Sequence, residues 1–200
     1  MSIDQLIRFE TEGQVALRVA NVEIGQGILT AVAQIAAEEL DITFQRIRVE
    51  RADTERTPAA STTGSNSIQN VGSAFRQAAA DARQLLLEKA AIALDAPVEN
   101  LQITDGTISD GKDETTYWDL QGDKLFGATE PGIGQPKAAA DYAIVGQPVP
   151  RLDLPAKVAD APSFVHDLDL PHMVHGRVVR PPTYTAALQA VDQSAATALP

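Results

Sequence analysis

Short runs of apolar residues open the chain and predict a β-hairpin. The runs Leu6–Glu10 and Gln14–Val19 are separated by Thr11-Glu12-Gly13, a polar tripeptide that ends in glycine. The spacing then changes, because apolar side chains at positions 28, 32, 35, 36 and 40 form one face of a helix. A strand is therefore expected to lead into a helix across Glu23-Ile24-Gly25-Gln26-Gly27.

A second strand and a second helix follow. Arg46–Val49 alternates polar and apolar residues, and a polar loop rich in serine and threonine occupies Asp53–Ser67. A helical stripe begins at Ile68 and can continue to Leu94, before Pro97 prevents further helix. Burying this stripe requires a sheet or another helix.

The next part of the chain predicts a hairpin and a short helix. Asp105-Gly106 lies between the apolar runs 101–104 and 107–108 and is a strong hairpin signal, which closes the first unit near residue 112. Thr116 is expected to cap a short helix over 117–120.

The last third of the chain predicts a linker and a separate segment. Glycine, proline and alanine dominate 122–150, as in linkers. Val174–Val179 and Ala187–Val191 resemble strands, and Ser194–Leu199 resembles one or two helical turns. We therefore predict an α+β chain with a sheet-and-helix segment over 1–120, a linker over 121–145 and another segment over 146–200.

Composition limits the partners and the compartment. The chain has 44% hydrophobic residues, enough to bury a core, and its net charge of -11 opposes binding to nucleic acid or anionic membranes. It has no cysteine, so any iron–sulfur cluster is expected on another chain. No stretch approaches the roughly 18 apolar residues of a membrane span, and no signal peptide begins the chain, which predicts a cytoplasmic protein.

Two loops at helix starts are candidate anion sites. Gly25 and Gly27 let the backbone approach a ligand where a helix begins, and helix starts carry unpaired N–H groups. Thr63-Gly64-Ser65 and Ser67 repeat this arrangement before the second helix. Both loops could bind a phosphate without a nearby lysine or arginine. The alternative is that the glycines only shape a turn and the hydroxyls only cap a helix.

Other candidate chemistry is weak. The chain has neither a third glycine three residues after Gly27 nor a Gly-Lys-Ser/Thr motif, which argues against standard nucleotide sites. His166, His172 and His175 lack a clear carboxylate partner, so we assign no metal ligand. Glu38 and Glu39 are expected on a helix surface rather than as acid and base. No catalytic residue is assigned.

Three stretches resemble one enzyme family. Glu23-Ile24-Gly25-Gln26-Gly27 with the following helix, and Asp53–Ser67, resemble the molybdopterin-binding segment of the xanthine oxidase and aldehyde oxidase family. Val149–Val158 and His175–Pro182 are similar to the opening of its α/β hammerhead domain. The hammerhead follows the pterin segment here, as in the group formed by the β subunits of isoquinoline 1-oxidoreductase and the B subunits of nicotinate dehydrogenase.

The resemblance implies a cofactor, site residues and a partner. Gln26, Thr63, Gly64 and Ser65 would bind the pterin and its phosphates, and Gly25, Gly27 and Ser67 are also expected as cofactor-binding residues. The cofactor would be molybdopterin, as the molybdenum-bearing cytosine dinucleotide. A small partner subunit would carry iron–sulfur clusters, and the reaction would be hydroxylation of an N-heterocycle or aldehyde with water as oxygen source.

One expected element is missing. The family uses a glutamate near its far carboxyl end as catalytic base, and no position here matches its motif; Glu130-Pro131 resembles it only superficially. We therefore expect an amino-terminal portion of the subunit. The alternatives are a non-catalytic truncated or split subunit that needs a second chain, and a simple phosphate- or nucleotide-binding module. Export of the complete complex also stays open.

Overall fold

A three-stranded sheet is built around the predicted amino-terminal hairpin. Strands β1 (Ile7–Glu10) and β2 (Gln14–Arg18) are antiparallel, and β3 (Ile47–Glu50) pairs in parallel with β2, giving the order β1-β2-β3. Leu6 does not begin β1 as expected, because it ends a short helix, α1 (Ile3–Leu6). The computed structural model describes residues 1–57, 60–127, 131–159 and 164–198.

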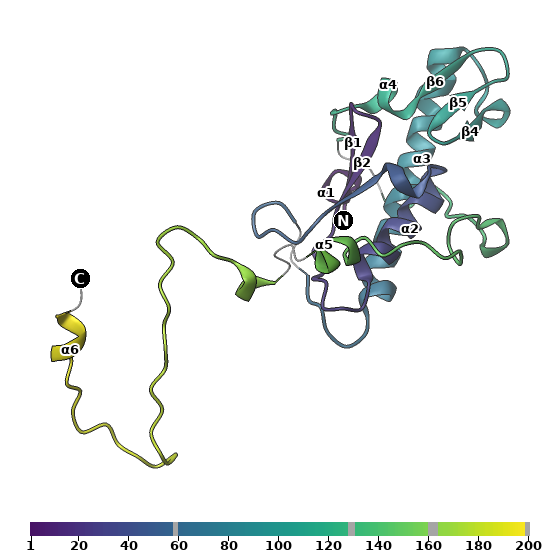
Figure 1. Ribbon diagram of the computed structural model, residues 1–200. Coiled ribbons are helices and arrows are strands. Elements are labelled where there is room, and N and C mark those ends of the chain that lie inside the picture. Colours follow the sequence, from purple (N-terminus) through teal and green to yellow (C-terminus); the bar gives the residue numbers. More distant parts are fainter. Residues whose placement is uncertain (58–59, 128–130, 160–163, 199–200) are drawn as a thin grey trace. The chain divides into compact units, whose positions relative to one another are not determined.

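Two helices pack side by side to form the core with this sheet (Figure 1). Helix α2 (Ile28–Leu40) connects β2 to β3, as the apolar spacing predicted. The second predicted helix is also present, but its first turn is a π-helix, η2 (Ile68–Gly72), which continues into α3 (Ser73–Leu94). Fully buried core side chains come from the sheet and from both helices, including Phe9, Val15, Leu17, Val32, Ala36, Leu40, Phe75, Ala79 and Leu86.

A second small sheet follows α3. Strands β4 (Gln102–Thr104) and β5 (Thr107–Ser109) form the predicted hairpin, with φ of 48° at Asp105 and 78° at Gly106. Two positive φ angles are what a two-residue hairpin turn requires. The unit does not close near residue 112, because a third strand, β6 (Glu114–Thr116), pairs with β5.

Helix α4 (Tyr117–Gln121) begins at the predicted cap. The Thr116 hydroxyl accepts a hydrogen bond from the Asp119 backbone N–H at 3.1 Å, and the Asp119 carboxylate accepts one from the Thr116 N–H at 3.2 Å. The Tyr117 side chain is fully buried and its hydroxyl donates to the Leu40 carbonyl at 2.9 Å. This bond fixes the end of α2 against the start of α4. Short 3₁₀ turns occur at Phe44–Arg46, Val98–Asn100, Ala139–Asp141 and Val165–Asp167.

The chain divides into two units, Met1–Ala161 and Pro162–Pro200. The described part of the stretch expected as a linker belongs to the first unit and packs against α2 and α3 through hydrogen bonds from residues 132–147. Helix α5 (Leu154–Val158), which the spacing did not predict, also belongs to the first unit.

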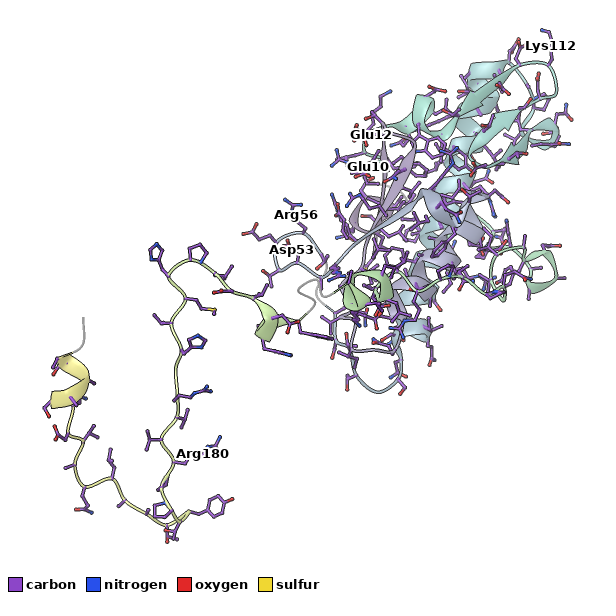
Figure 2. All side chains as sticks on the ribbon, viewed as in Figure 1. Glu10, Glu12, Asp53, Arg56, Lys112 and Arg180 are labelled. Carbon is purple, nitrogen blue, oxygen red and sulfur yellow. The ribbon has the colours of Figure 1, made fainter. Side chains whose placement is uncertain are left out.

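The second unit lacks the strands expected at Val174–Val179 and Ala187–Val191. Its described residues, 164–198, form no strand ladder, and the side chains of Val178 and Val179 are 82% and 94% exposed. A β-strand needs a neighbour for its backbone hydrogen bonds, and the described part of this unit supplies none. Figure 2 shows its side chains, Arg180 among them, along an open backbone. The expected terminal turn is present as α6 (Ser194–Thr197), and Leu199 lies outside the described residues.

Candidate cofactor-binding site

The Gly25-Gln26-Gly27 turn lies between β2 and α2, where the sequence predicted it. Gly25 and Gly27 have φ of 104° and 80°, a region that favours glycine. Their N–H groups donate to one carboxylate oxygen of Glu23, at 3.0 and 2.8 Å. The predicted anion position at the start of α2 is thus filled by the chain's own carboxylate. These two N–H groups are not free for a ligand while Glu23 stays in place.

The Gln26 amide is used within the same turn. Its oxygen accepts from the Ile24 N–H at 2.7 Å, and its nitrogen donates to the Val22 carbonyl at 3.0 Å. The residue is nevertheless exposed, as are Ile24 and Gly25. A ligand at this surface can therefore reach Gln26, but it must compete with bonds that stabilise the turn.

The hydroxyl loop, residues 61–67, precedes η2 and offers free donors. Gly64 and Ser65 have φ of 65° and 57°, so both residues of this turn are in the left-handed region. Thr63, Gly64 and Ser65 are exposed, and within the described structure neither the Thr63 nor the Ser65 hydroxyl has a hydrogen-bond partner. The π-turn η2 directly after the loop is of a kind often found at functional sites.

Asn21 brings the two predicted loops together. Its side chain is 1% exposed, and its Nδ2 donates to the Ser61 carbonyl at 3.3 Å and to the Ser67 hydroxyl at 3.2 Å. The next residue, Val22, donates its N–H to the Thr62 hydroxyl at 2.9 Å. The loops are 40 residues apart in sequence yet share these contacts. Asn21 was not predicted from the sequence, where its one signal was an amide directly after an apolar run.

The Asn21 side chain also carries an unpaired atom. Among the described residues its Oδ1 is the only buried side-chain oxygen or nitrogen without a hydrogen-bond partner. A buried unpaired acceptor costs about 1–3 kcal/mol, and such groups in native proteins usually have a structural or ligand-related cause. The unpaired oxygen therefore belongs to the residue that joins the two loops assigned from the sequence to one ligand.

A cation that sequence reasoning did not expect borders the glycine turn. The Arg151 Nη1 donates to the Gly25 carbonyl at 2.9 Å, and its Nη2 lies 3.6 Å from the Glu23 carboxylate. Arg151 also pairs with Asp153, whose other cationic partner is Lys157. Hydrogen bonds from Arg151 and then Lys157 hold the pKa of Asp153 well below its usual range. The site therefore contains an arginine, contrary to the expectation of a site without one.

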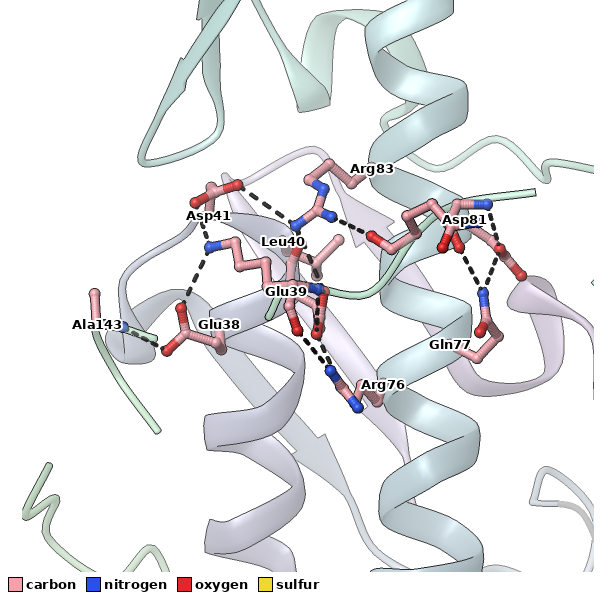
Figure 3. Close-up of polar contacts among 12 residues, drawn as sticks. Glu38, Glu39, Leu40, Asp41, Arg76, Gln77, Asp81, Arg83 and Ala143 are labelled. Atoms are coloured by element: carbon pink, nitrogen blue, oxygen red, sulfur yellow. Dashed lines mark hydrogen bonds and ion pairs between the residues drawn. The ribbon is translucent and has the colours of Figure 1, made fainter. Parts of the chain in front are cut away.

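Three buried carboxylates on α2 and α3 hold residues 132–145 (Figure 3). The expectation that Glu38 and Glu39 lie on a helix surface is wrong, because their exposed fractions are 2% and 1%. Glu38 Oε2 accepts the N–H groups of three successive residues, Ala143, Ile144 and Val145, at 2.9, 2.6 and 2.9 Å. Burial by itself would raise the pKa of Glu38, but these bonds outweigh burial and the pKa is lowered.

The other two carboxylates work in the same way. Glu39 accepts the Lys137 N–H at 3.0 Å and pairs with Arg76 and Arg83. Asp81, on α3, accepts the N–H groups of Gly132 and Gly134 at 3.0 and 2.8 Å. All three carboxylates bind backbone or cations, so none of them is available as an acid or base for a substrate.

The remaining candidates come from other parts of the sequence. His166, His172 and His175 belong to the second unit and are exposed. No group of three histidine or acidic side chains among the described residues is placed to hold a metal ion. Glu130 lies outside the described residues. None of the described helices has the length and apolar character needed to cross a bilayer.

Comparisons with known proteins point to one family. The family model described as the molybdopterin cofactor-binding domain matches residues 3–144. The B subunit of nicotinate dehydrogenase from Pseudomonas putida is 38% identical over 205 residues, which cover 97% of this chain and 17% of that protein. The beta chain of isoquinoline 1-oxidoreductase from Brevundimonas diminuta is 26% identical over 236 residues, covering 97% of this chain and 30% of that protein.

A solved structure agrees with the α+β architecture. Reconstituted CO dehydrogenase from Oligotropha carboxidovorans superposes with a TM-score of 0.51 at 30% identity, over 57% of this chain and 15% of that chain. The α+β class expected from the sequence is confirmed, and so is the resemblance on which the cofactor was predicted. The chain spans only 17% and 30% of the two curated relatives.

Proposed function

Because the chain belongs to the molybdopterin cofactor-binding domain family, we propose that its two Asn21-linked loops hold part of a molybdenum hydroxylase cofactor. The observation that carries this proposal is the contact between loops 40 residues apart, one bearing Gly25-Gln26-Gly27 and the other free hydroxyls. The sequence shows no reason why either loop should require the other in order to fold. A shared ligand explains why both are exposed and joined.

The residues fit an anionic pterin, with a division of roles that differs from the sequence prediction. The free hydroxyls of Thr63 and Ser65 and the left-handed backbone at Gly64 suit phosphate oxygens. Gln26 is the exposed amide for the pterin ring. The N–H groups of Gly25 and Gly27 contribute indirectly, since Glu23 takes both and thereby fixes the turn.

In this proposal the described residues of the two loops bind and orient the cofactor. When bound, the molybdenum cofactor supplies hydroxylation chemistry and accepts the electrons removed from the substrate. Glu38, Glu39 and Asp81 are occupied by internal hydrogen bonds, so no catalytic base is assigned in the described part of this chain. We propose that the base is supplied from outside the described residues.

The whole protein is proposed to hydroxylate an N-heterocycle or an aldehyde, with water as oxygen source. The names of the relatives support this class, since one acts on nicotinate and another on isoquinoline. The cofactor is proposed to be the cytosine dinucleotide form, with iron–sulfur clusters on a small partner subunit and the complex in the cytoplasm. The absence of cysteine in this chain agrees with clusters held elsewhere.

A cofactor-retention experiment tests the proposal. The chain is expressed in a host that makes molybdopterin, and molybdenum is measured by mass spectrometry and pterin by fluorescence after oxidation. We expect nearly one pterin per chain, and a loss of at least about tenfold in a Thr63→Ala/Ser65→Ala double variant, which removes two hydrogen-bond donors to a charged ligand. The matched control is Thr183→Ala/Thr185→Ala, two exposed hydroxyls of the second unit.

The outcomes separate the alternatives. A folded wild-type chain without pterin would contradict unaided binding and favour a split or truncated subunit. Equal pterin in wild type and the Thr63→Ala/Ser65→Ala variant would contradict the assigned loop. Tight binding of inorganic phosphate without pterin would instead favour a simple phosphate-binding module.

A further inference from the structure

Arg151 reaches the glycine turn from the far end of the first unit. It is 126 residues from Gly25 in sequence, yet its Nη1 donates to the Gly25 carbonyl at 2.9 Å. A Cβ added to Gly27 would lie 3.8 Å from the guanidinium carbon, so the planar group covers that glycine. The same guanidinium lies 3.6 Å from the Glu23 carboxylate, which holds the N–H groups of both glycines. One side chain therefore contacts three parts of the turn.

The guanidinium is itself fixed in place. Asp153 is 3% exposed and accepts two hydrogen bonds from Arg151, from Nε at 2.9 Å and from Nη2 at 2.7 Å. Such paired bonds define the orientation of an arginine and not only its position. Lys157 donates to the same carboxylate at 2.7 Å from the next turn of α5, so Asp153 does not carry an unbalanced buried charge.

A backbone bond extends the contact to α2. The Leu152 N–H donates to the Thr30 hydroxyl at 3.0 Å, and Thr30 lies in the first turn of α2 with 6% exposure. Residues 151–153 are thus attached both to the turn and to the helix that follows it. Two glycines with positive φ give the turn many accessible conformations, so contacts from outside it add to those of Glu23 in selecting one.

We infer that Arg151 is a positioning residue that selects the conformation of the Gly25-Gln26-Gly27 turn and so places Gln26 for the cofactor. The part of this inference that concerns the cofactor rests on the proposed function; the part that concerns the turn does not. A further consequence is that residues 151–157, which the sequence pattern assigned to a separate segment, belong to the cofactor-binding unit.

Hydrogen exchange of the cofactor-free chain tests the effect on the turn. In Arg151→Ala, the amides of Gly25 and Gly27 are expected to exchange about tenfold faster, because loss of a charge-assisted contact favours local opening. The melting temperature and the exchange of β1 and β2 should stay close to wild type. Arg151→Lys retains the charge but not the paired geometry, so it should restore only part of the protection. Arg56→Ala, at an exposed arginine labelled in Figure 2, is the matched control.

Pterin content in the same variants tests the effect on the cofactor. We expect Arg151→Ala to retain several-fold less pterin than wild type and Arg151→Lys to be intermediate. If wild type retains pterin and Arg151→Ala retains as much, with unchanged exchange at the turn, the inference is overturned. If wild type retains none, the proposed function fails, while faster exchange at Gly25 and Gly27 still supports the effect of Arg151 on the turn.

A second variant covers the case in which Arg151→Ala does not fold. Asp153→Asn keeps the guanidinium but removes the charge that orients it, so exchange at the two glycines should rise by a smaller factor. Exchange that rises equally throughout the first unit in both variants would show a general loss of stability and would overturn the positioning role.

Discussion

Replacing Glu38 by alanine is expected to release residues 143–145 from the first unit. The Glu38 carboxylate accepts three successive backbone N–H groups and lies 3.3 Å from the Lys137 ammonium. The three N–H groups would lose this acceptor in one step, whereas Lys137 would keep Asp41. The closely spaced N–H groups have no other carboxylate within the described contacts.

The expected cost follows from the number and type of these bonds. Hydrogen bonds to a charged acceptor contribute about 1.5–3 kcal/mol each, but three on one oxygen are not additive. Because Lys137 keeps Asp41, the cost comes from the three N–H groups left without an acceptor, at about 1–3 kcal/mol each and not fully additive, and we expect a loss of about 3–5 kcal/mol for Glu38→Ala. Glu38→Gln keeps an acceptor oxygen but not the charge, so a loss of about 1–2 kcal/mol is expected.

The loss should depend on pH in a defined direction. The folded-state pKa of Glu38 lies below its usual value of 4.5, so its carboxylate stabilises the fold fully above about pH 4.5. This stabilisation disappears as the pH falls through the lower folded-state pKa, because the folded chain must then take up the proton. Protonated Glu38 resembles glutamine, so the difference between wild type and Glu38→Gln should shrink towards pH 3.

Urea unfolding at pH 7, 4 and 3 provides the measurement, with the free energy of unfolding obtained by linear extrapolation. Glu12→Gln, at an exposed turn, is the control and should change stability by less than about 0.5 kcal/mol at every pH. A Glu38→Gln difference that stays constant between pH 7 and 3 would refute the ionic role. A cost of Glu38→Ala below about 1 kcal/mol would refute the hydrogen-bond argument itself.

Three further changes test other parts of the structure. Gly134→Ala would push a Cβ into the Ala80 carbonyl, so we expect the free energy of unfolding to fall by about 1–3 kcal/mol and trypsin to cleave faster after Lys137. Unchanged cleavage would contradict this close packing. Tyr117→Phe leaves the Leu40 carbonyl without its donor and should lower the free energy of unfolding in urea by about 1–2 kcal/mol. No change would mean that water replaces the hydroxyl. Asn21→Ala should speed hydrogen exchange in residues 61–67 while leaving α3 protected, and equal protection of that loop would show that Asn21 does not join the two loops.

Local patterns predicted the elements of the first unit well. The stripe from Ile68 to Leu94 and the Asp105-Gly106 turn each depend on neighbours in sequence, and both appear as expected. Strand β6 was missed because its three residues, Glu114–Thr116, carry no apolar signal and pair only because β5 is beside them. The strands expected in the second unit are absent from its described residues for the opposite reason. The apolar pattern is present there, but no neighbouring strand is described with which it could pair.

The site was predicted in part. Helical spacing and glycines located both loops. Spacing cannot show which acceptor a backbone N–H group will bond. Glu23, the nearest carboxylate in sequence, accepts from both Gly25 and Gly27. Asn21 and Arg151 were missed because their partners are 40 or more residues away in sequence. Burial of Glu38 and Glu39 was missed because acidic side chains are almost always exposed unless partners are supplied from elsewhere.

The buried carboxylates of α2 and α3 also mean that residues 131–147 behave like a docked peptide. Their backbone is recognised by Glu38, Glu39 and Asp81 much as a separate ligand strand would be. Cutting the chain between Lys124 and Gly127 should therefore leave two pieces that stay associated at neutral pH. Protonation of Glu38, whose pKa is lowered, should weaken this association as the pH falls below about 4.5, and a synthetic 131–150 peptide should rebind the remainder when the pH is restored.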